Sequence, residues 1–134
     1  MVGGLLLAIG ASVITASAAS LSVSPPATVS ISGPVTADDL KPAQCVGITL
    51  TAVVVGSGTF SGAVGDVNEL ILGSSLADTI NGDGGDDCIL GGGNDDTLDG
   101  EAGDDSLIGG PGTDTCTGGG QAGDIFDGCE TTNP

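Results

Sequence analysis

Residues 73–127 read GSSLADTIN-GDGGDDCIL-GGGNDDTLD-GEAGDDSLI-GGPGTDTCT-G-GGQAGDIFD, where hyphens mark units of nine residues and one extra glycine, Gly118. The sixth position of every unit is an aspartate: Asp78, Asp87, Asp96, Asp105, Asp114 and Asp124. Two places later comes an apolar residue or a cysteine: Ile80, Ile89, Leu98, Leu107, Cys116 and Phe126. Before the repeat, VGDVNELIL at residues 64–72 places Glu69 and Ile71 in the same positions. A flexible linker has no reason to keep this register, so the repeat predicts a solenoid.

Each unit combines a Gly-rich turn with a short strand. Glycine allows a positive φ, so a turn can direct its carbonyl oxygens inward, and Asn94 is the best substitute where a glycine is expected. A carboxylate that follows such a turn completes a set of hard oxygen donors. Calcium takes about 6–8 oxygen ligands, so two stacked turns could supply one ion.

The units resemble the G-G-x-G-x-D-x-U-x repeat of RTX-type (hemolysin-type) calcium-binding proteins. The resemblance implies an all-β fold, a right-handed parallel β-roll with two units in each coil. It assigns Asp78, Asp96 and Asp114 to one column of ligands. It assigns Asp87, Asp105 and Asp124 to a second column, with Glu69 beneath them. About four calcium ions would lie between neighbouring acids; the site at Asp78 is weakened by missing glycines, and a fifth ion at Glu69 is not favoured.

The composition limits the possible functions. The chain of 134 residues has a formal net charge of −17, with Lys41 as its one basic residue, and it contains no His, Arg, Trp or Tyr. Nucleic acid is excluded as a partner because phosphate contacts need Lys or Arg. Without His there is no Ser-His-Asp triad and no His-ligated metal, so we expect no enzyme. Disorder is the competing interpretation of such acidity, unless cations offset the charge.

The first part of the chain differs from the repeat. Residues 1–19 are apolar and contain the A-x-A pattern at Ala16 to Ala18, typical of a signal peptide, although no basic residue precedes Leu5; a membrane anchor is the alternative. Residues 20–44 are expected to form an extended leader. Residues 45–63 are rich in β-branched residues and predict a small β cap, ahead of the β-roll at residues 64–127 and a C-terminal tail at 128–134.

Four cysteines in an exported chain imply oxidation, with three pairings open. The favoured pattern joins Cys45 to Cys88, which ties the N-terminal strands to the repeat. It joins Cys116 to Cys129, which fastens the tail over the end of the roll.

The sequence therefore predicts a secreted calcium-binding protein whose repeats fold on binding calcium and act as a structural module. No membrane association is expected after cleavage of the signal peptide. The alternative is an extracellular adhesion or interaction module that binds an unknown cell-surface partner through an acidic face, with calcium incidental.

Overall fold

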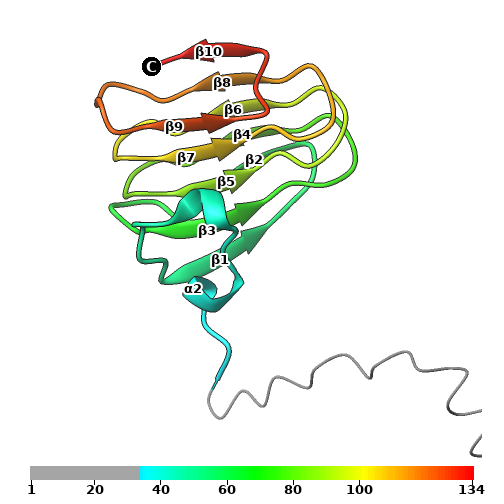
Figure 1. Cartoon of the computed structure of the whole chain (residues 1–134). Helices are drawn as coiled ribbons and strands as arrows, with labels where there is room; N and C mark the ends of the chain where they lie inside the picture. Colours follow the sequence, from blue (N-terminus) through cyan, green and yellow to red (C-terminus); the bar gives the residue numbers. More distant parts are fainter. Residues whose placement is uncertain (1–33) are drawn as a thin grey trace, which may run out of the picture. The chain divides into compact units, whose positions relative to one another are not determined.

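Two parallel sheets form the body of the molecule in a computed structural model that describes residues 34–134 (Figure 1). The odd sheet contains β1 (Ala52–Val55), β3 (Glu69–Leu72), β5 (Cys88–Leu90), β7 (Ser106–Ile108) and β9 (Ile125–Asp127). The even sheet contains β2 (Thr59–Ser61), β4 (Thr79–Asn81), β6 (Thr97–Asp99), β8 (Thr115–Thr117) and β10 (Thr131–Asn133). The predicted all-β parallel β-roll is confirmed. The predicted signal peptide at 1–19 and residues 20–33 of the leader lie outside the described residues.

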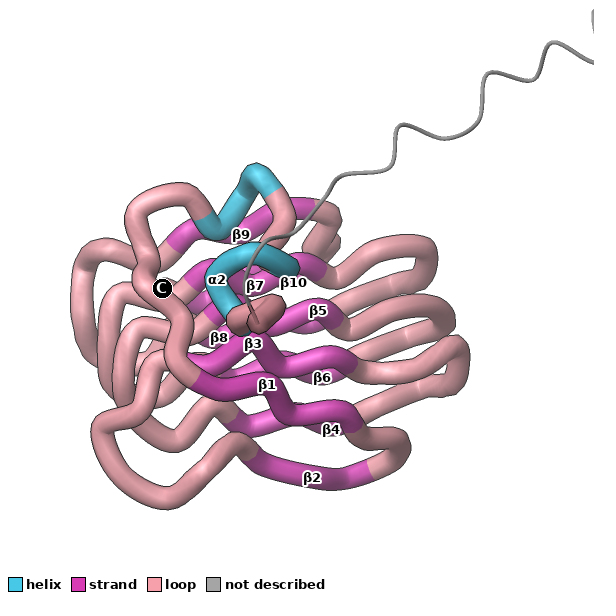
Figure 2. The backbone as a smooth tube through the Cα atoms, turned by 90° about the horizontal axis from the view of Figure 1, so that it is seen from below, coloured by secondary structure: helices cyan, strands magenta, loops and turns pink. Residues whose placement is uncertain are grey.

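The register of the strands shows why two nine-residue units make one coil. The chain changes sheet after every strand, so each strand pairs with the strand two units away (Figure 2). Ile71 is opposite Ile89, and Ile89 is opposite Leu107, which are steps of 18 residues along the sequence. The next partner, Phe126, lies 19 residues after Leu107, so the turn between them absorbs the extra Gly118.

The inner core fills the space between the sheets. Its members are the apolar residues that follow the repeated acids, and the most deeply buried are Ile71, Ile80, Ile89, Leu98, Leu107 and Cys116. Val54 and Phe60 pack against one end of this cluster, and Phe126 and Cys129 pack against the other. One side chain from each of the strands β1 to β9, together with Cys129, thus builds a narrow core along the stack.

The segments expected as a cap and a tail belong to the roll itself. Within residues 45–63, β1 and β2 pair in parallel with β3 and β4, so residues 52–61 form the first coil of the roll. At the other end β10 pairs in parallel with β8, and the tail supplies the last strand. The reason is that parallel pairing satisfies the backbone groups of the terminal repeat strands, as it does those within the stack.

A second core lies on the outer face of the odd sheet and was not predicted. The helix α2 (Ala37–Leu40), the turn η1 (Ala43–Cys45) and the loop after it cover this face (Figure 1). The buried members of this core are Ala37, Cys45, Ile48, Leu50, Leu70 and Cys88, with Leu72, Leu90 and Ile108 packed at their side. No helix among residues 34–134 is long and apolar enough to cross a membrane.

The outer face of the even sheet is polar. A threonine row runs across all five of its strands, in register and exposed: Thr59, Thr79, Thr97, Thr115 and Thr131. A parallel row on the same strands contains Ser61, Asn81, Asp99, Thr117 and Asn133. The two sheets therefore share one inner core, but the outer face of the odd sheet is apolar and that of the even sheet is polar.

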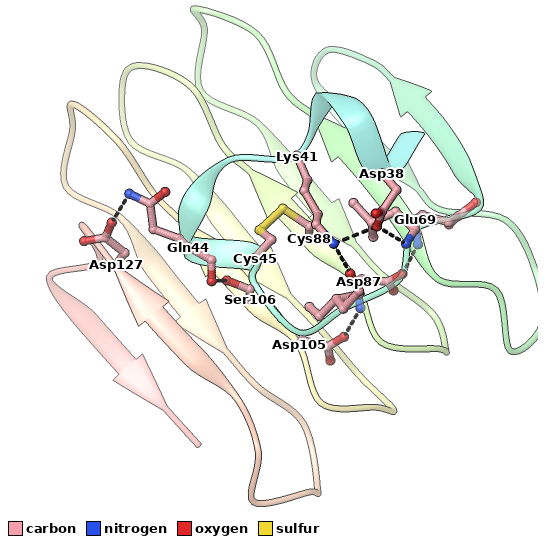
Figure 3. The surroundings of a disulfide bond; sticks show 12 residues. Asp38, Lys41, Gln44, Cys45, Glu69, Asp87, Cys88, Asp105, Ser106 and Asp127 are labelled. Atoms are coloured by element: carbon pink, nitrogen blue, oxygen red, sulfur yellow. Dashed lines mark hydrogen bonds and ion pairs between the residues drawn. A yellow bond between two sulfur atoms is a disulfide. The ribbon is translucent and has the colours of Figure 1, made fainter. Parts of the chain in front are cut away.

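Both disulfides have the predicted pairing. Cys45 is bonded to Cys88 over a sequence separation of 43, which fastens the covering segment to β5 (Figure 3). Nearby, the Ser106 hydroxyl donates to the Gln44 carbonyl at 3.1 Å, which adds a contact between the covering segment and β7. Cys116 is bonded to Cys129 over a separation of 13, which ties β8 to the last turn.

Removal of the Cys45–Cys88 bond is expected to cost the most covalent stabilisation. By the loop-entropy relation, a separation of 43 residues corresponds to about 4 kcal/mol, against about 3 kcal/mol for a separation of 13. The double variants C45A/C88A and C116A/C129A, unfolded by urea in excess calcium, measure the difference. If C45A/C88A unfolds at the wild-type urea concentration, the Cys45–Cys88 bond does not stabilise the roll.

Candidate metal centre

Buried carboxylates form two columns along the turns of the roll. The first column contains Asp78, Asp96 and Asp114, and the second contains Glu69, Asp87, Asp105 and Asp124. All except Asp124 are at most 2% exposed, and Asp124 is partly buried. The structure therefore brings the sequence-predicted acids together in the predicted order.

Hydrogen bonds link the repeated acids of consecutive coils. The main-chain N–H of Asp87 donates to Oδ1 of Asp105 at 2.8 Å, and that of Asp105 donates to Oδ1 of Asp124 at 3.0 Å. In the first column the N–H of Asp78 donates to Oδ1 of Asp96 at 2.8 Å. One oxygen of each repeated acid thus serves as the link between consecutive coils.

Glu130 completes the first column and was missed in the sequence analysis. Its Oε2 accepts a hydrogen bond from the main-chain N–H of Asp114 at 2.7 Å, which is the position of the next repeated acid. Glu130 follows Asp114 by 16 residues instead of 18, so it falls out of register with the nonapeptides. The signal available was its place at the start of a final Thr-rich strand, β10.

The second oxygen of the column acids has no hydrogen-bond partner. Among the described residues, six buried carboxylate oxygens are in this state: Glu69 Oε1 and the Oδ2 atoms of Asp87, Asp96, Asp105, Asp114 and Asp124. Burying a charge without a partner is expensive. The one basic side chain, that of Lys41, is 2.7 Å from Asp38 and also donates to the Ile48 carbonyl, so no side-chain cation remains for the columns.

Backbone carbonyls lie beside these unpartnered oxygens. At Gly82, the point where a Cβ would stand lies 2.7 Å from Asp87 Oδ2 and 2.7 Å from the carbonyl oxygen of Gly100, one coil further on. A side chain at this position would fill the cradle, so glycine keeps it open. The same pair of an acid oxygen and a glycine carbonyl recurs at Gly91, Gly100 and Gly109.

Asp78 has the same glycine carbonyl beside it, at Gly73, but differs in its hydrogen bonds. Its Oδ2 accepts hydrogen bonds from the main-chain N–H of Ser74 at 2.6 Å and from the Ser74 hydroxyl at 2.9 Å, while its Oδ1 accepts from the N–H of Gly58. Both oxygens are therefore satisfied by the protein. Ser74 occupies the second position of its unit, where Gly92 and Gly110 stand in the next units of this column.

The pKa values of the column acids follow from burial. Desolvation raises the pKa of Asp87 to about 8 and that of Asp105 to about 6, with neighbouring acids adding to the rise. Burial also raises the pKa of Asp96. The pKa of Asp78 is lowered, because its hydrogen bonds from Ser74 and Gly58 outweigh the effect of burial. Asp87, Asp96 and Asp105 thus resist ionisation in the absence of a cation.

A cleft of about 240 Å³ opens beside the second column. Its lining includes the acids Asp86, Asp104 and Asp105 and the apolar residues Val46 and Ile125. Asp86 accepts a hydrogen bond from the main-chain N–H of Asp104 at 3.0 Å, so these two acids also link consecutive coils. The cleft gives Asp105 an approach from solvent, which a metal site requires.

The donor set fits calcium. All of the atoms available in the cradles are oxygens, which hard cations prefer, and the four cysteines are held in disulfides. Among residues 34–134 no three carboxylate or thiol side chains gather around one point. A bound ion would therefore combine single carboxylates with backbone carbonyls of consecutive coils, and Asp87, Asp96, Asp105 and Asp114 offer such cradles.

Comparison with known proteins supports this assignment. Residues 64–98 and 90–125 match the family model of the RTX calcium-binding nonapeptide repeat, with four copies. The resemblance seen in the sequence is thereby confirmed for this stretch, somewhat less than half of the chain. Neither the comparison with curated proteins nor that with solved structures finds a match.

Asp96 and Asp78 are expected to respond differently to the same substitution. Asp96→Asn removes a charge from an unpartnered oxygen, so calcium affinity should fall by about tenfold or more. Asp78→Asn should leave calcium binding almost unchanged, because both oxygens of Asp78 are already bonded. Isothermal titration calorimetry compares the two variants, and equal losses of affinity would contradict the distinction.

The calcium-free roll is expected to be more stable in acid than at pH 8. The folded pKa values of Asp87 and Asp105, about 8 and about 6, exceed the ordinary value of 3.8, so the folded chain binds more protons than the unfolded chain in this window. The stabilisation is complete below pH 3.8 and is lost as the pH rises to about 8.

Far-ultraviolet circular dichroism in the presence of chelator should show β signal that increases from pH 8 to pH 5. In excess calcium the trend should reverse, because protons compete with the ion for the carboxylates. A calcium-free signal that increases with pH would contradict the assigned direction.

Proposed function

We propose that this chain, which carries RTX calcium-binding nonapeptide repeats in residues 64–125, is a secreted calcium-binding module whose roll is completed and stiffened by the ions it binds. The unpartnered buried oxygens of the columns carry this proposal. They lie beside glycine carbonyls, the two donor types that calcium takes. About four ions are proposed, held by Asp87, Asp96, Asp105, Asp114 and Asp124, with Asp78 in a secondary role.

The ions would couple binding to folding. Four divalent ions reduce the net charge from −17 to about −9 and give the buried oxygens their missing partner. The narrow inner core contributes one side chain per strand, so much of the free energy of folding is expected to come from the metal. An affinity of about 10⁻⁴–10⁻³ M, the range of extracellular modules, would match this role.

The disulfides support an extracellular setting. Two bonds that involve all four cysteines are typical of proteins exposed to an oxidising compartment. The family match and the signal-like residues 1–19 agree with export. We propose no catalytic activity, because the chain has no His or Arg with which to build the common acid–base or phosphate-binding sites.

The burial of the columns separates this function from the adhesion alternative. An acidic binding face requires exposed carboxylates, whereas Asp87, Asp105 and Asp114 are at most 1% exposed. A partner bound through the remaining surface acids stays compatible with the module, but the repeated acids themselves would serve calcium.

A calcium titration of the oxidised chain is the direct test. Calcium should increase the β signal in far-ultraviolet circular dichroism, chelator should reverse it, and magnesium should not reproduce it, because magnesium demands a small octahedral shell. A spectrum that is already folded and indifferent to calcium would remove the metal-coupled mechanism and leave the interaction module as the better interpretation.

A further inference from the structure

We propose that the pair Asn81–Gly82 is a site of spontaneous deamidation, which proceeds when calcium is absent and is blocked when calcium is bound. The inference rests on the proposed function, because it requires that calcium holds the roll folded. Asparagine is a chemically labile residue, and of the four asparagines in the chain Asn81 is the one that a glycine follows. Glycine has no side chain to hinder attack by its own nitrogen, and it gives the backbone the freedom that the attack needs.

The reaction needs water as its only co-reactant. The main-chain nitrogen of Gly82 attacks Cγ of Asn81, and a bond between these two atoms forms. The side-chain amide nitrogen leaves as ammonia, with the proton that the Gly82 nitrogen gives up. Water then opens the cyclic imide at either carbonyl. The product is aspartate, or isoaspartate, in which the backbone runs through the former side chain and is one methylene group longer.

In the folded roll the attacking nitrogen is held away from this reaction. Asn81 ends β4, which lies between β2 and β6 in the even sheet (Figure 1). The main-chain N–H of Gly82 donates to the carbonyl of Asp99 at 2.7 Å, and the Asn81 carbonyl accepts from the N–H of Gly62 at 2.8 Å. Attack would break the first bond and turn this peptide out of the ladder, so the strand must open first.

The side chain of Asn81 is held as well. Its Oδ1 accepts a hydrogen bond from the main-chain N–H of Asp83 at 2.7 Å, and its Nδ2 donates to Oε1 of Glu101 at 3.0 Å. Both ends of the amide are therefore engaged, although Asn81 is only partly buried. When the coils separate, these bonds are lost and Asn81 and Gly82 become an unrestrained pair.

The products would damage a calcium cradle. Gly82 leaves room beside Asp87 Oδ2 and the Gly100 carbonyl, each of which is 2.7 Å from the position of its missing Cβ. Isoaspartate formed from Asn81 lengthens the backbone directly before Gly82, and either product adds a negative charge beside Glu101. A larger residue in place of Gly82 would slow the reaction but would fill the cradle. A period without calcium would therefore cause a permanent loss of calcium affinity.

Mass spectrometry of the oxidised full-length chain tests the site. Parallel samples are kept at neutral pH in excess calcium and in chelator, and fragments that contain Asn81 are analysed over time. Deamidation of Asn81 should be slower in calcium by about tenfold or more, because it is confined to molecules in which the strand has opened. Asn94 is the internal control, since Asp95 follows it and hinders the attack. It should stay unmodified in both samples.

Refolding gives a second readout, which measures the consequence for the cradle. After increasing times in chelator, calcium is restored and the recovered β signal is measured by far-ultraviolet circular dichroism. The recovered signal should decline in the wild type in step with deamidation. It should persist in Asn81→Gln, because glutamine keeps an amide but forms a cyclic imide far more slowly. An equal decline in both chains would assign the loss to another process and overturn the damage to the cradle.

The proposed function and this inference fail separately. If circular dichroism shows no response to calcium, the proposed function falls, and calcium has no means of protecting Asn81. If calcium folds the chain but Asn81 is modified at the same rate with and without the ion, or stays intact in both samples, only the protected modification site is wrong.

Discussion

The roll depends on how each repeated carboxylate divides its two oxygens. One accepts the main-chain N–H of the acid one coil earlier, so the side chain belongs to the backbone ladder of the stack. In Asp87, Asp96, Asp105 and Asp114 the other is buried beside a glycine carbonyl without a partner, whereas both oxygens of Asp78 are bonded. The first oxygen fixes the register of the coils, and the second makes the folded state incomplete until a cation is present. The same side chain thus links the coils and requires a cation.

Much of this arrangement could be predicted because the repeat is strict. The inner core was predicted from the spacing of residues such as Asp96 and Leu98, and the coil of two units from the resemblance to the RTX repeat. The pairing seen in both disulfides was the favoured one of three. The covered face was missed, although the sequence contains its signal: apolar residues flank Ile89 in one unit, and polar residues flank Leu98 in the next. The hydrogen bond from the Ser74 hydroxyl to Asp78 could not be predicted, because the sequence does not specify where this side chain points.

The first and the last coils of the roll are stabilised by different interactions. Early coils are supported by the covering segment, by the Cys45–Cys88 bond and by the hydrogen bonds around Asp78. In the later coils Ile125 is about half exposed, and the covering segment reaches β9 through the hydrogen bond from Gln44 to Asp127. The Cys116–Cys129 bond fastens this end. Apolar packing outside the inner core therefore supports the first coils more than the last ones.

The outer face of the odd sheet is apolar and covered, whereas that of the even sheet is polar and exposed. This difference determines how many residues an insertion into the repeat must contain. Duplicating a single unit of nine residues would shift every later strand to the other sheet. Leu90 and Ile108 would then face water, and threonines such as Thr97 would lie on the side that the N-terminal segment covers. Duplicating a pair of units leaves each strand on its own side. An insertion into the repeat, by gene duplication or by engineering, therefore keeps the apolar and polar outer faces intact only if it adds whole coils of 18 residues.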